Sequence, residues 1–185
     1  MLERIRKEKE SATQTSKGKR KTADSYIFKG EDNLYYEKIG TETTCIQDEI
    51  PFDIPSTWIW CRLGNISSLL DGNIVSKKSL PYLEAKYLRG KVEATYVNTG
   101  KFIHKGETLI LVDGENSGEI FHIQEDGYQG STFRVLKTHN SLCKEYVYMF
   151  ITKNKQLLKS SKKGSAIPHL NRKIFQELIA VSYTH

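Results

Sequence analysis

Three short stretches in the middle of the chain show the apolar patterns that β-strands show. Residues 108–112 (TLILV) form an apolar run, and residues 119–123 and 131–136 alternate apolar with polar positions. Segments that contain glycine separate the three stretches and are typical of turns. The pattern predicts three strands that pair in a small antiparallel sheet or a barrel-like core.

The hydrophobic period changes to that of a helix between residues 141 and 160. Its apolar positions are Leu142, Tyr146, Met149, Phe150, Leu157 and Leu158. Ser141 is a suitable N-cap and Gly164 a suitable stop, so the pattern predicts a helix packed on the strands. Irregular N-terminal elements, a strand-rich middle and a helix together predict the fold class α+β.

The segment before the strands has a different character. Residues 1–11 have high helix propensity, but they are too few and too polar to form a stable helix alone. We interpret them as the end of a longer helix. The basic run at residues 17–21 (KGKRK) is either a solvated linker or a phosphate contact. We therefore expect a helix end and linker over residues 1–25 and one domain over residues 26–185.

Between these regions the pattern is less regular. Trp58 and Trp60 are two residues apart, which places both rings on one face of a strand and predicts core packing for both. Residues 66–70 suit a short helix or a strand, and residues 71–73 suit a turn. Residues 74–100 show no clear period.

Composition adds a weak indication of the partner. The chain of 185 residues has a net charge of +6, which suits a polyanion only together with a more specific feature. Its three cysteines form no CxxC pair, which favours reduced thiols in a cytoplasmic protein, with Cys61 and Cys143 as small core residues. No secretory signal or long apolar segment is present, so we expect no membrane partner.

Motifs for catalysis are missing from the sequence. The five histidines show no zinc-ligand spacing, and residues 113–118 (DGENSG) match neither a P-loop nor a dinucleotide-binding fingerprint. No nucleophile elbow occurs, and none of the four prolines adjoins another, as the NPPY motif of an adenine methyltransferase requires. We expect no catalytic residue, no metal site and no cofactor.

Several phrases resemble those of a known family. In chain order they are residues 35–40 (YYEKIG), 50–55 (IPFDIP), 58–64 (WIWCRLG), 106–118 (GETLILVDGENSG) and 164–171 (GSAIPHLN), followed by Phe175 and Leu178. They resemble a target-recognition domain of type I restriction-modification specificity subunits over nearly the whole chain. The family continues into a proline-rich phrase and a long helix, whereas this chain stops at His185, so we expect a fragment.

The resemblance implies a function. In that family two recognition domains each read one half of a split duplex DNA site, and helical spacers set their distance and dock the modification subunits. Residues 1–10 resemble the end of such a coiled-coil spacer. Methylation, translocation and cleavage belong to the partner modification and restriction subunits, so the chain is expected to be a non-catalytic DNA reader at the nucleoid in the cytoplasm.

Candidate DNA contacts follow from residue type and position. Base edges are read by Arg, Asn, Gln, Ser or Thr on well-held loops, whereas Lys suits phosphates. Three expected loops supply Asn73, Lys77 and Lys78; Asn116 and Ser117; and Lys162, Lys163 and Ser165. Secondary candidates are Arg89, Lys91, Gln129, Arg134, Asn171 and Arg172. We expect Asn116 and Arg134 to read bases and the four lysines to contact phosphates.

Two other classes of function compete with this interpretation. The first is a generic protein-interaction module whose basic surface is incidental, which salt-dependent binding to duplex DNA would separate from a DNA reader. The second is a fragment of a methyltransferase or nuclease, against which the missing motifs argue.

Overall fold

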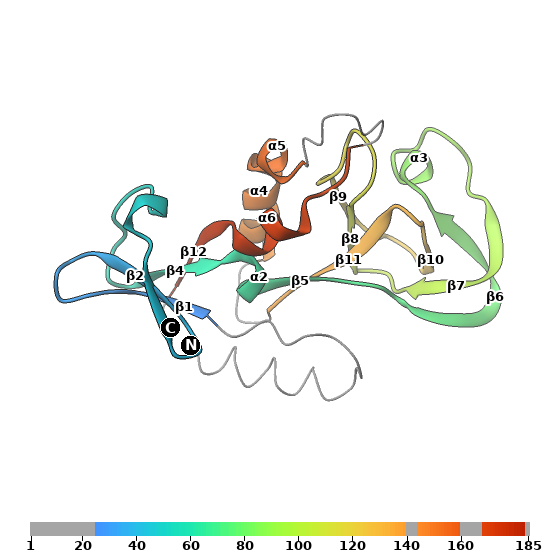
Figure 1. The fold of residues 1–185 in the computed structure, drawn as a ribbon. Coiled ribbons are helices and arrows are strands. Elements are labelled where there is room, and N and C mark those ends of the chain that lie inside the picture. The colour runs from blue at the N-terminus through green and yellow to red at the C-terminus, as the bar shows by residue number, and fades with distance from the viewer. Residues whose placement is uncertain (1–24, 140–143, 160–167, 184–185) are drawn as a thin grey trace. The chain divides into compact units, whose positions relative to one another are not determined.

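The computed structural model describes residues 25–139, 144–159 and 168–183 (Figure 1). By their internal contacts these residues divide into two compact units. The first unit includes residues 25–66 and 176–183, and the second includes residues 67–138, 144–159 and 168–175. Each unit has its own hydrophobic core and is described by itself.

The first unit consists of two small antiparallel sheets. Its elements are β1 (Ser25–Lys29), β2 (Tyr35–Ile39), β3 (Glu42–Cys45), η1 (Gln47–Glu49), β4 (Trp58–Arg62), α2 (Leu63–Ile66) and β12 (Ile179–Tyr183). β1, β2 and β3 pair in chain order, and β12 pairs antiparallel with β4, with Ile179 opposite Arg62 although the two strands lie far apart in the sequence. The last described strand therefore completes the unit that the first strands begin.

The prediction that both tryptophans pack in the core holds for one of them. Trp60 is buried, in a cluster with Ile27, Tyr35, Ile46 and Val181, as predicted. Trp58 is 37% exposed, so the prediction of core packing is wrong for it. Trp58 is the first residue of β4, and the strand becomes buried only from Trp60 onward.

The second unit holds the remaining elements, with α6 ending in the first unit. They are β5 (Ser67–Leu70), β6 (Asn73–Leu83), α3 (Ala85–Leu88), β7 (Tyr96–Ile103), β8 (Thr108–Leu111), β9 (Ile120–His122), β10 (Gly127–Gln129), β11 (Phe133–Thr138), α4 (Lys144–Lys153), α5 (Lys155–Leu158) and α6 (Arg172–Glu177). The α+β class is confirmed. None of the helices in the described residues is long and apolar enough to cross a membrane.

An open antiparallel sheet contains the strands that the hydrophobic pattern predicts. Its order is β5-β11-β8-β9, and β8, β9 and β11 correspond to the predicted stretches at 108–112, 119–123 and 131–136. β8 is buried along its whole length, which explains its apolar run without alternation. The short segment at 66–70, left open between helix and strand, ends α2 and then forms β5.

A ring of three other strands was missed by the sequence analysis. β10 pairs parallel with β6 and antiparallel with β7, while β6 and β7 pair with each other, so the three close a small barrel. The expectation of a loop at residues 73–78 is wrong, because they lie in β6. A register shift between Ser76 and Leu80 breaks the alternation there and hides the strand from a period-two pattern.

Tight packing inside this ring depends on glycine. A Cβ atom at Gly127 would lie 2.7 Å from the Pro81 carbonyl oxygen and 2.7 Å from the Leu83 Cγ. Leu83, Ile103 and Phe133 have no exposed surface and belong to one core cluster with strands of the open sheet. The ring and the open sheet therefore share one hydrophobic core.

The predicted helix at 141–160 is present but broken. α4 and α5 meet at Asn154, whose side-chain amide donates to the Phe150 carbonyl at 2.9 Å. Val147, Ile151 and Leu158 are its buried residues. Met149 and Leu157, which the pattern placed on the apolar face, are 69% and 60% exposed, so the predicted face is partly wrong. Residues 141–143 and 160 lie outside the described residues, as does Cys143.

Candidate nucleic-acid interface

The loop between β8 and β9 is fixed by its own backbone. The amide of Gly118 donates to the Leu111 carbonyl at 2.7 Å, and that of Gly114 donates to the Pro168 carbonyl at 2.8 Å. Gly114 and Gly118 have φ angles of +106° and +90°, a backbone region that residues other than glycine rarely adopt. The expected strand, glycine loop and strand at residues 106–118 are confirmed.

The two predicted DNA-binding residues of this loop differ in exposure. Asn116 is exposed, so its amide is available to a partner. Ser117 is 1% exposed, and its buried hydroxyl has no hydrogen-bond partner among the residues that the structure describes. Ser117 is therefore not at the surface of this conformation, although its residue type and position in a loop suggested exposure.

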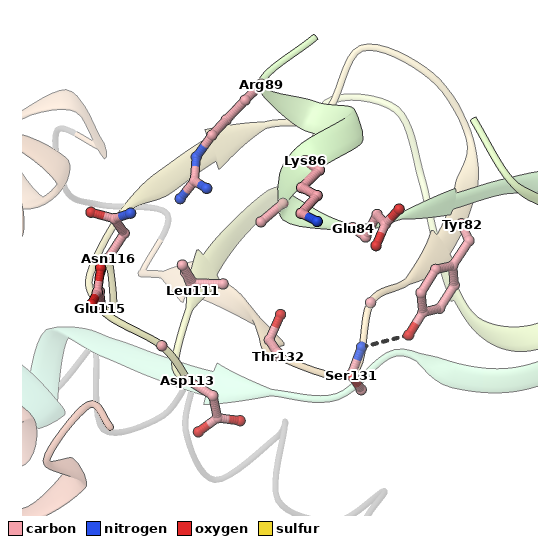
Figure 2. Close-up of a pocket in the computed structure, with 13 residues that line it drawn as sticks. Tyr82, Glu84, Lys86, Arg89, Leu111, Asp113, Glu115, Asn116, Ser131 and Thr132 are labelled. Carbon is pink, nitrogen blue, oxygen red and sulfur yellow. Dashed lines mark hydrogen bonds between the residues drawn. The ribbon is translucent and has the colours of Figure 1, made fainter. Parts of the chain in front are cut away.

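The same loop borders an open pocket of about 410 Å³ (Figure 2). Figure 2 shows Lys86 and Arg89 on the α3 side and Asn116 on the loop side. The Tyr82 hydroxyl accepts a hydrogen bond of 2.8 Å from the Ser131 amide at the rim. The pocket carries three carboxylates, from Glu84, Asp113 and Glu115, against two cations, which does not favour a phosphate as its occupant.

Arg89 is engaged inside the protein. Its guanidinium forms a two-point ion pair with Glu119 and lies over the Phe121 ring at 5.8 Å from the centroid. The hydrogen bonds that Arg89 donates to the Glu119 carboxylate raise the pKa of Arg89. Lys91, by contrast, is exposed on the segment that connects α3 to β7.

Arg134 and Gln129 meet at Asp71, which the sequence analysis did not single out. Asp71 Oδ1 accepts from Gln129 Nε2 at 3.1 Å and lies 3.5 Å from Arg134 Nε. It also pairs with Lys101 Nζ at 2.8 Å. Burial raises the pKa of Asp71, but hydrogen bonds from Lys101 and Gln129 and the charge of Arg134 outweigh it and lower the pKa.

The Gln129 side chain bonds backbone groups inside the unit and is not available at the surface. Besides Asp71, its side chain bonds the Phe133 carbonyl at 2.8 Å and the Gly72 amide at 3.0 Å, and the residue is only 5% exposed. Its amide is therefore used inside the second unit. Arg134 is half-buried and donates to the Phe133 carbonyl at 2.6 Å.

The other predicted residues fall into three groups. Asn73 and Lys78 are exposed on β6, which also carries Lys77, whose side chain lies outside what the structure describes. Asn171 caps α6, since its side-chain oxygen accepts from the amides of residues 173 and 174 at 3.0 and 3.2 Å. Arg172 beside it is exposed. Lys162, Lys163 and Ser165 lie outside the described residues.

The described residues provide no cluster of metal ligands and no ionised thiol at Cys61. They contain no group of three His, Cys, Asp or Glu side chains that could hold a metal ion. Burial raises the pKa of the Cys61 thiol to about 12, which keeps it protonated as the predicted core residue. His169 and Asp113 form an exposed pair, with Nδ1 and Oδ1 2.6 Å apart, that the sequence analysis missed because 56 residues separate them.

Comparison with known proteins identifies relatives of this chain. The family model described as "Type I restriction modification DNA specificity domain" matches residues 55–179. The specificity subunit of the type I restriction enzyme MjaVIII of Methanocaldococcus jannaschii is 29% identical over 136 residues. The match takes in 68% of this chain and 32% of that subunit, so the chain spans about a third of the length of this curated relative.

Solved structures share the fold. The HsdS subunit from Thermoanaerobacter tengcongensis matches 71% of this chain with a TM-score of 0.50 and 20% identity, over 34% of its own length. A chain from a study of complex assembly and conformational transition of the type I R-M system matches 71% of this chain and 35% of its own length, with a TM-score of 0.51 and 17% identity. The arrangement of strands and short helices is therefore similar to that of these two structures.

Proposed function

The chain belongs to the family of type I restriction modification DNA specificity domains, and from this premise we propose that it reads one half of a split target in duplex DNA. The single observation that carries the proposal is the family match over residues 55–179, which include the whole described part of the second unit. The chain supplies sequence readout within a specificity subunit.

The exposed polar residues of the second unit support this role. Asn73, Lys78, Lys91 and Asn116 are exposed, and Asn116 stands on a loop of fixed backbone. Asn is suited to paired hydrogen bonds with adenine, and Lys to phosphates. Ser117 is buried, Gln129 bonds the backbone of Gly72 and Phe133, and Asn171 caps α6, so these three side chains are used inside the protein.

The partners follow from the family. The chain directs the modification (methyltransferase) subunits and, through them, the restriction subunit to the bound site, and it works in the cytoplasm beside the nucleoid. It carries no catalytic group of its own. The spacer-helix end and basic linker expected over residues 1–25 lie, apart from Ser25, outside the described residues, and we propose residues 26–185 as the recognition domain.

Selection from a random pool of duplexes tests the proposal. The purified chain is incubated with DNA of random sequence, and the bound duplexes are recovered, amplified and sequenced over several rounds. One short sequence is expected to be enriched, because a specificity domain discriminates between bases. A pool that stays random would contradict the proposal and favour a protein-interaction module with an incidental basic surface.

The same preparation tests for catalysis. Incubated with the selected duplex and S-adenosylmethionine, the chain alone is expected to transfer no methyl group and to leave the DNA uncut. Methylated or cleaved product from the chain alone would overturn the assignment of catalysis to the partner subunits.

A further inference from the structure

The two longest strands of the second unit have a solvent-facing side. β6 runs over 11 residues and β7 over 8, and Figure 1 shows them side by side. Ser76, Thr99 and Lys78 are exposed, and Ile74 is 76% exposed. The ribbon formed by β6 and β7 therefore presents polar side chains and one apolar side chain to solvent.

The charge on these strands indicates which partner. Neither β6 nor β7 contains Asp or Glu, whereas the strands carry Lys77, Lys78 and Lys101. Lys78 forms no ion pair with any residue that the structure describes. The two strands thus contribute cations and no carboxylate of their own, although Asp71 pairs with Lys101, and this charge favours a polyanion over a neutral protein surface.

The strand register places four side chains on one face. Ile74 lies opposite Lys101, and Ser76 lies opposite Thr99. The Ser76 hydroxyl donates to the Thr99 hydroxyl at 2.9 Å, and Thr99 donates to the Val75 carbonyl at 3.3 Å. The two hydroxyls are thus held together in the open, with acceptor capacity left on Ser76.

The opposite face is braced from within the ring. Val75 lies opposite Gly100, where a Cβ atom would come within 3.0 Å of the Tyr128 side chain. Tyr128 is fully buried, and its hydroxyl lies 3.3 and 3.2 Å from the carbonyl oxygens of Lys78 and Asn98, which share its single proton. Lys78 lies within the register shift of β6 and Asn98 lies on the facing part of β7, so Tyr128 fixes the backbone of the irregular part of the ribbon.

We propose that the outward face of the β6–β7 ribbon, built on Ile74, Ser76, Thr99 and Lys101, enters a groove of duplex DNA and selects bases there. The major groove is about 12 Å wide and admits a two-stranded β-ribbon. Hydroxyls read base edges, an aliphatic side chain contacts the thymine methyl group, and Lys78 contacts a phosphate. The inference rests on the proposed function and adds the element that performs the readout.

Lys101 can exchange its ion pair with Asp71 for a contact with a DNA phosphate. Its ion pair with Asp71 is partly exposed, with side-chain exposures of 37% and 42%, so a phosphate can replace the carboxylate at small cost. Asp71 keeps its hydrogen bond from Gln129 and its proximity to Arg134 when Lys101 leaves. The exchange therefore leaves Asp71 with other positive or polar neighbours.

Paired hydroxyl substitutions test the readout. The Ser76→Ala, Thr99→Val chain is compared in the random-pool selection with a Thr43→Val, Thr44→Val control, which removes two exposed hydroxyls from β3 in the first unit. The ribbon variant is expected to lose discrimination at one or two base pairs by about fivefold or more. The control is expected to select the same sequence as the unaltered chain.

A lysine substitution tests the phosphate contact of Lys78, and a tyrosine substitution tests the bracing of the ribbon by Tyr128. Lys78→Ala is expected to weaken binding to all sequences alike and to flatten the salt slope by about one unit, whereas Lys153→Ala on α4 is the matched exposed control. Tyr128→Phe removes only the bracing hydroxyl and is expected to relax the same base pairs as the ribbon variant. Tyr82→Phe, which removes another hydrogen-bonded hydroxyl from the second unit, is expected to leave them unchanged.

Cross-linking gives a readout that does not depend on lost binding. Ile74→Cys introduces a thiol on the ribbon, and duplex of the selected sequence carries a disulfide tether on a base. A disulfide to position 74 is expected, with none to the exposed native Cys45 on β3. Cross-linking at Cys45 and not at position 74 would overturn the inference.

The outcomes distinguish this inference from the proposed function. A chain that selects no sequence refutes both. A chain that selects a sequence, while the ribbon variants keep circular-dichroism spectra and base preference unchanged, refutes the ribbon inference and leaves the proposed function standing. Ribbon variants that read DNA normally but no longer assemble with methyltransferase subunits would also refute it, since the ribbon would then dock a protein.

Discussion

Arg62 is the most heavily engaged charged residue of the first unit. Its guanidinium donates to Glu37 and Glu49 at 2.6 Å each and to the Glu177 carbonyl at 2.7 Å. The side chains of Arg62 and Glu37 are only 13% and 8% exposed. A nearly buried carboxylate that lost this partner would keep its charge at neutral pH at a large cost in free energy, or take up a proton.

Arg62→Met is therefore expected to destabilise the first unit by about 3–5 kcal/mol. Both tryptophans of the chain lie on β4 of that unit, so their fluorescence during urea denaturation measures the effect there. Lys29→Met is the control, because its ion pair with Asp53 spans 3.4 Å between exposed side chains and should contribute at most about 1 kcal/mol. Equal losses in the two variants would contradict this account of Arg62.

The pH dependence has a definite sign. Burial raises the pKa of Glu37, but hydrogen bonds from Arg62 and Ser25 and the charge of Arg62 outweigh it, so the pKa is lowered below 4.5. A lowered carboxyl pKa contributes stability above the unfolded value and loses it as pH falls through the folded value. Tryptophan-monitored stability should therefore fall below about pH 4.5. In Arg62→Met burial is no longer offset by the guanidinium, so the acid-induced fall that Glu37 contributes should be lost or reversed, and an unchanged profile would count against the pair.

Residue type alone misplaced several polar side chains. Ser117 and Gln129 are residue types that read DNA, but both are buried, Ser117 in the Gly114–Gly118 loop and Gln129 in β10, where its side chain bonds Gly72 and Phe133. Asn171 was a secondary candidate for a DNA contact, but its side chain caps α6, a helix that the hydrophobic pattern did not predict. Side-chain chemistry is visible in a sequence, whereas the direction in which a loop turns depends on distant partners such as Pro168.

At the level of elements, predictability followed the regularity of the strand. β8, β9 and β11 were predicted because their apolar residues face one shared core. β6 and β7 were missed because one side faces solvent and the register shift after Ser76 changes the face that is buried. The proposed DNA-reading ribbon is thus built from the strands that carry the weakest hydrophobic pattern.

Closure of the three-strand ring depends on Gly127. Gly127→Ala is expected to destabilise the second unit by about 1–3 kcal/mol or more, because the new methyl group meets the Pro81 carbonyl and the Leu83 side chain at 2.7 Å. Hydrogen exchange of the amides of β6, β7 and β10 measures the loss in that unit. Gly40→Ala is the control, where the added group meets nothing within 4 Å and only the φ of +60° costs about 1 kcal/mol. Full protection of the ring in Gly127→Ala would refute the tight packing.

For the whole molecule, net charge sets the strength of non-specific binding. The chain carries +6, and a single half-site module neutralises few phosphates. We expect weak binding to random duplex, with a slope of log K against log salt of about −0.9 for each phosphate contacted. Fluorescence anisotropy between low and moderate salt measures the slope. Affinity that does not change with salt would contradict an electrostatic DNA interface.

The family assignment leads to one decisive experiment on the central claim. Residues 26–185 replace one recognition domain of a working type I specificity subunit, and the methylated adenines of the host genome are mapped. If the chain reads one half of a split target, one half of the methylated sequence changes to a new motif while the other half stays as before. A methylated motif that remains unchanged in both halves, from an assembled and active enzyme, would contradict the claim that this chain reads DNA sequence.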